Sequence, residues 1–305
     1  MRILTSTGST PQFVTTKQWD LAFHGGPIDA RGTAAVEWVR ERASLAHVCD
    51  YDIRNSRGLL LNGMRAPARD IATQLVNARS VLLEATTLGL VELLNLLRAA
   101  QSHGLAGVDI LYLEPNEYRR EVVLDAPWTR EFSLSTSRRF EGVPGFLADL
   151  SLVPERQGRL VAFLGYEGAR LAQACEQLDA LASWRKYAVF GIPGYAPGWE
   201  INAMANNVAT LQKEGFESVR FCGAASVSGA YDLLEAIHAE GVTDDATTVV
   251  APLGTKPHGI ATALFLIAHS RFQASSLIYD HPARSPNRST EIRKWHLYRV
   301  RFNAP

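Results

Sequence analysis

Apolar runs of strand length alternate with amphipathic stretches along most of the chain. The stretch 88–102 carries Leu90, Leu93, Leu94 and Leu97 at the i, i+3, i+4, i+7 spacing of a helix. The predicted strands are apolar on both faces, which is typical of parallel strands covered by helices on each side. The pattern predicts an α/β protein with a Rossmann-like, mainly parallel sheet and helices on both faces, and leaves open whether two such halves are present. The predicted strands cover 81–87, 108–113, 159–164, 187–192, 218–222, 247–253, 275–279 and 294–302, and the predicted helices cover 88–102, 169–181, 202–214, 230–240 and 257–269.

Residues 1–80 have a less regular pattern. The sequence Gly25-Gly26-Pro27 predicts a turn, and the apolar spacing over 33–46 predicts a helix. The run 55–62 predicts a hairpin or a single strand beside a polar loop. How these elements join the sheet does not follow from the pattern.

The length of 305 residues allows one large α/β domain or two smaller ones. Three prolines stand among Arg and Glu residues between 120 and 158, and they predict a boundary in that stretch. We expect 1–150 to form an N-terminal α/β domain and 151–305 to form a Rossmann-like ligand-binding domain. The prolines are Pro127, Pro144 and Pro154.

Composition narrows the classes of function. Lys and Arg number 31, as do Asp and Glu, so the chain lacks the basic field that drives non-specific nucleic-acid binding. The N-terminus has no apolar signal region and no apolar run is long enough for a bilayer, so we expect a cytoplasmic protein without a membrane partner. The cysteines are three, far apart and without a CxxC pair, which argues against disulfides and a zinc site. The histidines also lack metal-ligand spacing, so we predict no metal and no cofactor.

The sharpest local signal is the sequence Gly254-Thr255-Lys256, between the strand 247–253 and a helix that begins near Pro257. Open parallel sheets bind ligands beyond the carboxyl ends of their strands, and a helix N-terminus there attracts anions. Glycine allows close backbone approach, threonine can cap the helix or donate to a phosphate, and lysine adds a positive charge. An ordinary strand-to-helix turn with a solvated lysine is the alternative. Neither a P-loop nor GxGxxG is present.

Other strand ends carry acidic and basic residues. Gly165, Glu167 and Arg170 follow the strand 159–164 and are candidates for ligand binding, with a helix N-terminal turn as the alternative. Glu84 lies in the run Glu84-Ala85-Thr86-Thr87 of the predicted strand 81–87, and Glu114 stands at the end of the next predicted strand. These carboxylates, with Glu167, are the candidates for acid/base catalysis or for holding a ribose hydroxyl, and solvated loop ends are the alternative.

Two loops add aromatic and basic candidates. Tyr195 and Trp199 lie in a Pro/Gly-rich loop and can stack on a nucleobase, or they can anchor the loop in the core. Arg284 and Arg288 lie in a segment rich in Arg, Ser and Asn, whose side chains donate to phosphates. An exposed loop without a ligand is the alternative for that segment.

The order of strand, Gly254-Thr255-Lys256, helix, strand and basic last strand resembles the CARF and CARF-like Rossmann domains of prokaryotic antiviral systems. The resemblance covers 159–302, and Leu253 stands where the family usually has glycine. Those domains are sensors that bind cyclic oligonucleotides through a Gly-Gly-Thr-Lys turn. The resemblance implies that Gly254, Thr255 and Lys256 contact a phosphate.

Three functions follow as hypotheses. The first is a protein that binds a nucleotide or another phosphorylated molecule, as a sensor or a subunit of a defence or regulatory complex. The second is a hydrolase or transferase for a nucleotide-like substrate that uses Glu84, Glu114 or Glu167. The third is a scaffold subunit without a ligand. A protein partner and a homodimer are both left open.

Overall fold

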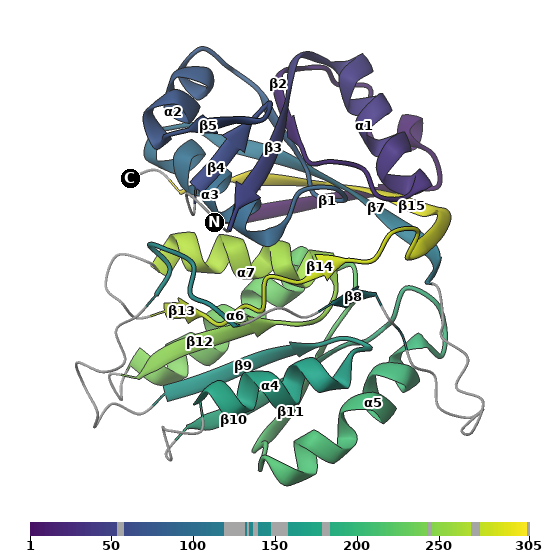
Figure 1. Ribbon diagram of the computed structural model, residues 1–305, viewed down its shortest axis with the longest axis vertical. Helices are drawn as coiled ribbons and strands as arrows, with labels where there is room; N and C mark the ends of the chain where they lie inside the picture. The colour runs from purple at the N-terminus through teal and green to yellow at the C-terminus, as the bar shows by residue number, and fades with distance from the viewer. Residues whose placement is uncertain are drawn as a thin grey trace. The chain divides into compact units, whose positions relative to one another are not determined.

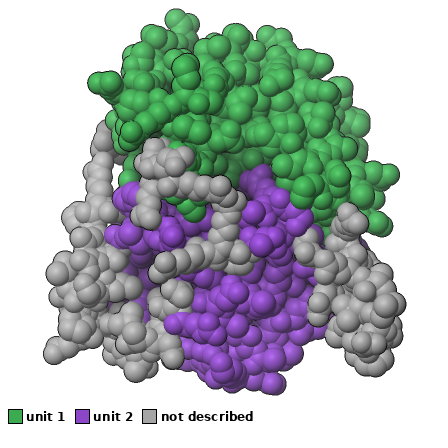
Figure 2. Space-filling model, viewed as in Figure 1, with its two compact units in different colours: residues 1–118, 286–305 green, residues 119–285 purple. Residues whose placement is uncertain are grey.

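The computed structural model describes residues 1–53, 58–118, 132, 134–136, 140–147, 158–178, 184–242, 246–269 and 275–303. The chain forms two compact units (Figure 2). Unit 1 comprises Met1–Tyr118 and Pro286–Pro305, and unit 2 comprises Arg119–Ser285. Both units have an α/β architecture, as the alternation of apolar runs and amphipathic stretches predicts.

Unit 2 contains a parallel sheet with the strand order β11-β10-β9-β12-β13 among its described residues. The first strand along the chain, β9, therefore lies in the middle of the sheet. Strands β9 and β12 are completely buried, which explains why most of their positions are apolar. The strands are β9 (Gly158–Leu164), β10 (Arg185–Gly191), β11 (Ser218–Cys222), β12 (Thr247–Pro252) and β13 (Ser275–Leu277).

Helices cover both faces of this sheet (Figure 1). Helices α4 and α5 pack against each other and against β9 and β10 on one face. Helices α6 and α7 pack against each other on the other face, where they contact β11, β12 and β13. The helices are α4 (Gly168–Leu178), α5 (Trp199–Lys213), α6 (Val227–Val242) and α7 (Lys256–His269), and a separate two-stranded sheet joins β8 (Ser135–Thr136) to β14 (Ala283–Arg284).

Unit 1 contains a larger sheet with the described strand order β1-β15-β7-β6-β2-β3-β4-β5. Its centre is parallel, β7-β6-β2-β3, and antiparallel strands extend it at both sides. The strands are β1 (Arg2–Gly8), β2 (Trp19–His24), β3 (Ala43–Asp52), β4 (Gly58–Leu61), β5 (Met64–Ala66), β6 (Val81–Glu84), β7 (Gly107–Tyr118) and β15 (Ser289–Arg301).

Three α-helices and a short 3-10 helix are described in unit 1. Helix α1 begins after Asp29, whose Oδ1 accepts a hydrogen bond of 2.8 Å from the Gly32 N–H and so caps the first turn. Helix α3 ends at Ser102 because Gly104 takes a positive φ of 73°. The helices are η1 (Pro11–Phe13), α1 (Ala30–Arg42), α2 (Ala68–Val76) and α3 (Leu90–Ser102).

Long-range pairing changes several predicted elements. The helix expected over 33–46 ends at Arg42, because Ala43 onward pairs with β2 as strand β3. The strand expected over 108–113 continues through Pro115. Proline is accommodated there because β6 pairs with β7 only as far as Leu111, so one side of β7 needs no N–H at Pro115. Part of the expected hairpin over 55–62 lies outside the described residues, and its remainder is strand β4.

The chain divides at different points from the expected 1–150 and 151–305. The first crossing lies between Tyr118 and Arg119, and the chain returns to unit 1 at Pro286. The reason is β15, which pairs antiparallel with β7 and β1 and buries Trp295 and Leu297 in the core of unit 1. Local composition does not reveal this pairing. The basic last strand therefore does not extend the sheet of unit 2.

Candidate functional site at the strand crossover of unit 2

Strands β9 and β12 are hydrogen-bonded neighbours, although two strands separate them along the chain. From β9 the chain proceeds to β10 and β11 on one side, and from β12 it proceeds to β13 on the other side. The loops after β9 and β12 thus diverge from one edge of the sheet. Such a topological switch point is where open α/β sheets bind ligands.

The two loops at this edge lie in close contact through glycines. A Cβ atom on Gly165 would lie 2.6 Å from the carbonyl oxygen of Leu253. A Cβ atom on Gly254 would lie 3.0 Å from Nδ1 of His258 and 3.1 Å from the carbonyl oxygen of Leu164. A side chain at Gly165 would therefore collide with backbone, and one at Gly254 would be tightly crowded. The structure brings together the two motifs that the sequence predicted separately, Gly165 and Gly254-Thr255-Lys256.

Helix α7 begins directly at the second motif. Lys256 is its first residue and is half-buried, and the Gly259 N–H makes a helical hydrogen bond of 3.1 Å to the Thr255 carbonyl. The Thr255 hydroxyl donates a 2.7 Å hydrogen bond to the carbonyl of Ala224. That bond ties the turn to the loop after β11. The first turn of a 14-residue helix presents N–H groups and the positive end of its dipole at the crossover.

His258 and Cys222 lie beneath this turn, and no sequence pattern had indicated a role for either residue. Nε2 of His258 lies 3.3 Å from the Gly223 carbonyl oxygen and 3.4 Å from Sγ of Cys222. Burial lowers the pKa of His258 to about 4, and burial raises the pKa of Cys222 to about 12. Both side chains are therefore neutral near pH 7, and the pair does not supply a thiolate nucleophile.

Glu167 and Arg170 form an ion-pair network rather than two separate binding groups. Arg170 donates hydrogen bonds of 2.6 and 2.7 Å to the buried carboxylate of Asp280 and lies 3.4 Å from Glu167. Glu167 also accepts hydrogen bonds from the N–H and hydroxyl of Ser135. Burial lowers the pKa of Arg170. The hydrogen bonds to Asp280 and its negative charge raise that pKa by more, so the net shift is upward. The network fixes the loop after β9 and the start of α4.

Helix α5 supports the loop after β9 from its own side. Asn206 donates a 2.6 Å hydrogen bond to the Tyr166 carbonyl, and Asn207 donates one of 2.9 Å to the Gly165 carbonyl. Trp199, the first residue of α5, packs edge-on against Tyr166 with ring centroids 6.2 Å apart. Tyr195 is buried. Trp199 therefore lies beside the crossover loop, and burial favours an anchoring role for Tyr195.

The two predicted arginines lie in different units. Arg284 belongs to β14 in unit 2, where it pairs with Ser135 of β8. Arg288 follows the return of the chain to unit 1 and is half-buried. The structure does not combine them into one basic segment of a single unit.

The carboxylate candidates Glu84 and Glu114 lie in unit 1, where Glu84 ends β6 and Glu114 lies within β7, beyond Leu111, the last residue paired with β6. Glu84 is completely buried and accepts hydrogen bonds from the N–H groups of Thr86 and Thr87 and from the Thr87 hydroxyl. Glu114 is also buried and accepts a 2.8 Å hydrogen bond from Nε2 of His296. The alternative of solvated loop ends is therefore wrong for both residues.

Within the described ranges no group of three or more His, Cys, Asp or Glu side chains has an arrangement that could hold a metal ion. None of the helices in the part of the chain that the structure describes is long and apolar enough to cross a bilayer. Neither a protein-family model nor a curated protein matches this chain.

Proposed function

We propose that unit 2 binds a nucleotide or another phosphorylated molecule at the crossover between β9 and β12. The observation that carries the proposal is the start of α7 at Lys256, beside the carboxyl edge of the neighbouring parallel strands β9 and β12. Rossmann-like sheets bind phosphorylated ligands at this edge.

Different residues around the crossover would contact different parts of such a ligand. The first turn of α7 offers N–H groups to a phosphate, and Lys256 adds a positive charge. Trp199 provides an aromatic side chain beside the loop after β9 for a base, whereas Tyr166 is stacked on Phe132 with ring centroids 4.7 Å apart. Arg170 is neutralised by Asp280 and Glu167, so it holds the loop in shape and contributes little charge to the ligand.

The substitution Lys256→Ala tests this site by isothermal titration calorimetry with a panel of nucleotides. Loss of a charge-assisted hydrogen bond should weaken binding by about 1–3 kcal/mol. Lys213→Ala is the matched control, because Lys213 lies exposed at the end of α5 and pairs only with its neighbour Glu214 among the described residues. Equal affinity of the wild type and the Lys256→Ala variant would remove Lys256 from the site.

The proposal extends to a sensor or subunit of prokaryotic antiviral defence, located in the cytoplasm. The Gly254-Thr255-Lys256 turn supports a cyclic oligonucleotide as the first ligand to test. Mononucleotides and linear oligonucleotides of the same bases are the other arms of the panel. A preference for the cyclic form supports the sensor role, whereas equal binding of all arms supports a general phosphate site. Native mass spectrometry should also detect a phosphorylated molecule, a protein partner or a homodimer in the purified sample.

A hydrolase or transferase is the second candidate, because of a hydrogen-bonded relay in unit 1. Nε2 of His296 lies 2.8 Å from the buried Glu114 carboxylate, and Nδ1 lies 2.9 Å from Oγ1 of the exposed Thr7. A carboxylate that orients a histidine beside a hydroxyl has the arrangement of an activated nucleophile. Turnover of a nucleotide or ester substrate should then fall by at least about 100-fold in Glu114→Gln, the scale of acid/base catalysis. Ligand binding without turnover by the wild type would contradict this candidate.

A further inference from the structure

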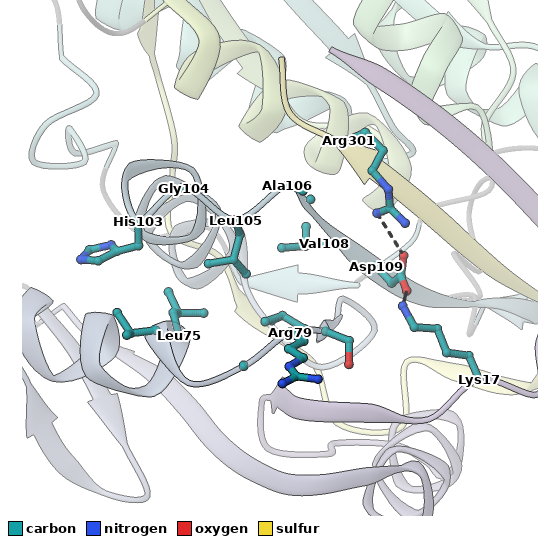
Figure 3. Close-up of a pocket in the computed structure, with 15 residues that line it drawn as sticks. Lys17, Leu75, Arg79, His103, Gly104, Leu105, Ala106, Val108, Asp109 and Arg301 are labelled. Carbon is teal, nitrogen blue, oxygen red and sulfur yellow. Dashed lines mark hydrogen bonds and ion pairs between the residues drawn. The ribbon is translucent and has the colours of Figure 1, made fainter. Parts of the chain in front are cut away.

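A pocket opens in unit 1 at the amino ends of β6 and β7, the opposite edge from Glu84 and Glu114 (Figure 3). Its walls come from the segment before β2, the connection from α2 to β6, the connection from α3 to β7, and the end of β15. The volume is about 460 Å³. Small-molecule sites measure roughly 300–1,000 Å³, so the pocket can hold a metabolite.

One oxygen of the buried Asp109 carboxylate accepts hydrogen bonds from the described residues, and the other does not. Oδ2 accepts hydrogen bonds of 2.7 Å from Nζ of Lys17 and 2.8 Å from Nε1 of Trp19. Oδ1 is also buried, accepts no hydrogen bond from the described residues, and lies 3.9 Å from Nη1 of Arg301. Figure 3 shows Asp109 between Lys17 and Arg301 at the pocket. A buried acceptor without a donor is uncommon in folded proteins, and a ligand in the pocket would satisfy it.

The charges around the pocket favour an anion. The charged side chains among its described lining residues are Lys17, Arg79 and Arg301, which are positive, and Asp109, which is negative. Three positive charges and one negative charge leave a net charge of two positive units on these four side chains. Lys17 pairs with Asp109 at 2.7 Å, and Arg301 lies 3.9 Å from the same carboxylate, so the cluster around Asp109 remains positive. Leu75 and Leu105 give the same pocket an apolar wall.

We propose that this pocket binds a small organic anion, a carboxylate or a phosphate monoester, that also carries an N–H or O–H donor. The anionic group pairs with Arg79 and Arg301. The donor binds Oδ1 of Asp109, and the carbon skeleton packs on Leu75 and Leu105. The site is independent of the crossover in unit 2, because its lining residues all belong to unit 1.

The first test measures binding of matched probes to the full chain by protein-observed NMR. Phenyllactate carries both the anion and the donor, 3-phenylpropionate lacks the donor, and phenyllactamide lacks the anion. We expect phenyllactate to bind about ten times more tightly than either partial analogue, the scale of one hydrogen bond to a charged group. 4-Hydroxyphenyl phosphate in the same assay distinguishes a phosphate site from a carboxylate site. Failure of both the carboxylate and the phosphate probe to bind would overturn the proposal.

The second test uses variants. The double substitution Arg79→Gln/Arg301→Gln should reduce the affinity for the anionic probe at least about tenfold. Arg40→Gln is the control, because Arg40 is an exposed arginine of α1 that does not line the pocket. Asp109→Asn should remove the preference for phenyllactate over 3-phenylpropionate, and circular dichroism confirms that this variant folds. Unchanged affinity in the double variant would overturn the assignment, whereas Lys256→Ala should leave this binding intact.

Discussion

The two units contain the same kind of strand crossover but close it with different chemistry. In unit 1 a Cβ atom on Gly25 would lie 2.4 Å from the Thr87 carbonyl oxygen, and in unit 2 one on Gly165 would lie 2.6 Å from that of Leu253. Each glycine follows a central parallel strand and contacts the loop across the switch point. Topology alone therefore does not distinguish the two sites.

The polar groups at the two crossovers make the difference. In unit 1, the Glu84 carboxylate accepts hydrogen bonds from the N–H groups of Thr86 and Thr87. The Thr87 hydroxyl oxygen accepts a hydrogen bond of 2.9 Å from the Gly25 N–H. In unit 2, Gly254, Thr255 and Lys256 are only partly buried and carry a positive charge at a helix N-terminus. The comparison indicates that a crossover identifies an edge of the sheet, and that the burial and charge of the groups there decide whether that edge suits an anion.

Removing the internal acceptor of unit 1 should have the largest effect. Glu84→Ala would leave two buried N–H groups and a hydroxyl without their carboxylate, so the free energy of unfolding should fall by about 3 kcal/mol or more. Urea denaturation measures the change. Glu37→Ala, at an exposed position of α1, should change stability by less than about 0.5 kcal/mol. A small change in both variants would show that unit 1 does not depend on this internal network.

Acidification should destabilise the protein through His258 at the crossover in unit 2. The pKa of His258 is lowered by burial from 6.5 to about 4, so the unfolded chain binds a proton first. Stability from this residue is complete above about pH 6.5 and is lost as the pH falls toward 4, by at most about 3 kcal/mol. Urea titrations between pH 7 and 4 should therefore show a flatter profile for His258→Gln than for the wild type. Parallel profiles would indicate that His258 is accessible to protons in the folded state.

Alanine at the two crossover glycines should have a moderate effect that separates the units. The new Cβ atom meets backbone in both cases, so Gly25→Ala and Gly165→Ala should each lower the free energy of unfolding by about 1–3 kcal/mol. Only Gly165→Ala should also weaken nucleotide binding. Gly26→Ala is the control, because a Cβ atom there meets nothing within 4 Å. Equal loss of nucleotide binding in Gly25→Ala and Gly165→Ala would contradict the separation of roles.

Local pattern predicted the elements of unit 2 well, because the central strands β9 and β12 are buried and rich in apolar residues, and amphipathic helices alternate with the strands. The strand 218–222 has the same bounds as β11, and the helix expected from Pro257 begins one residue earlier as α7. Strand order depends on pairing between distant segments, so the sequence predicted Gly165 and Gly254 as separate motifs and did not predict their contact.

Other features depended on contacts that no local pattern encodes. The return of β15 to unit 1 depends on its pairing with β7 and β1. The burial of Glu84 depends on donors from the next three residues, which the run Glu84-Ala85-Thr86-Thr87 contains but does not distinguish from an exposed loop. His258 lies in the first turn of the apolar helix α7, where the local sequence does not indicate its contact with Cys222. The position of Asp109 beside a pocket also depends on the fold, and no sequence pattern identified this residue.

Hydrogen–deuterium exchange of the full chain, with and without the tightest-binding nucleotide of the panel, tests the central claim most directly. Ligand at the crossover should slow exchange of the amides in peptides that contain 165–168 and 254–259, the loop after β9 and the first turn of α7. Peptides that contain 84–89, at the crossover of unit 1, should exchange at unchanged rates. Protection confined to unit 1, or no protection at the start of α7 under saturating ligand, would contradict the account.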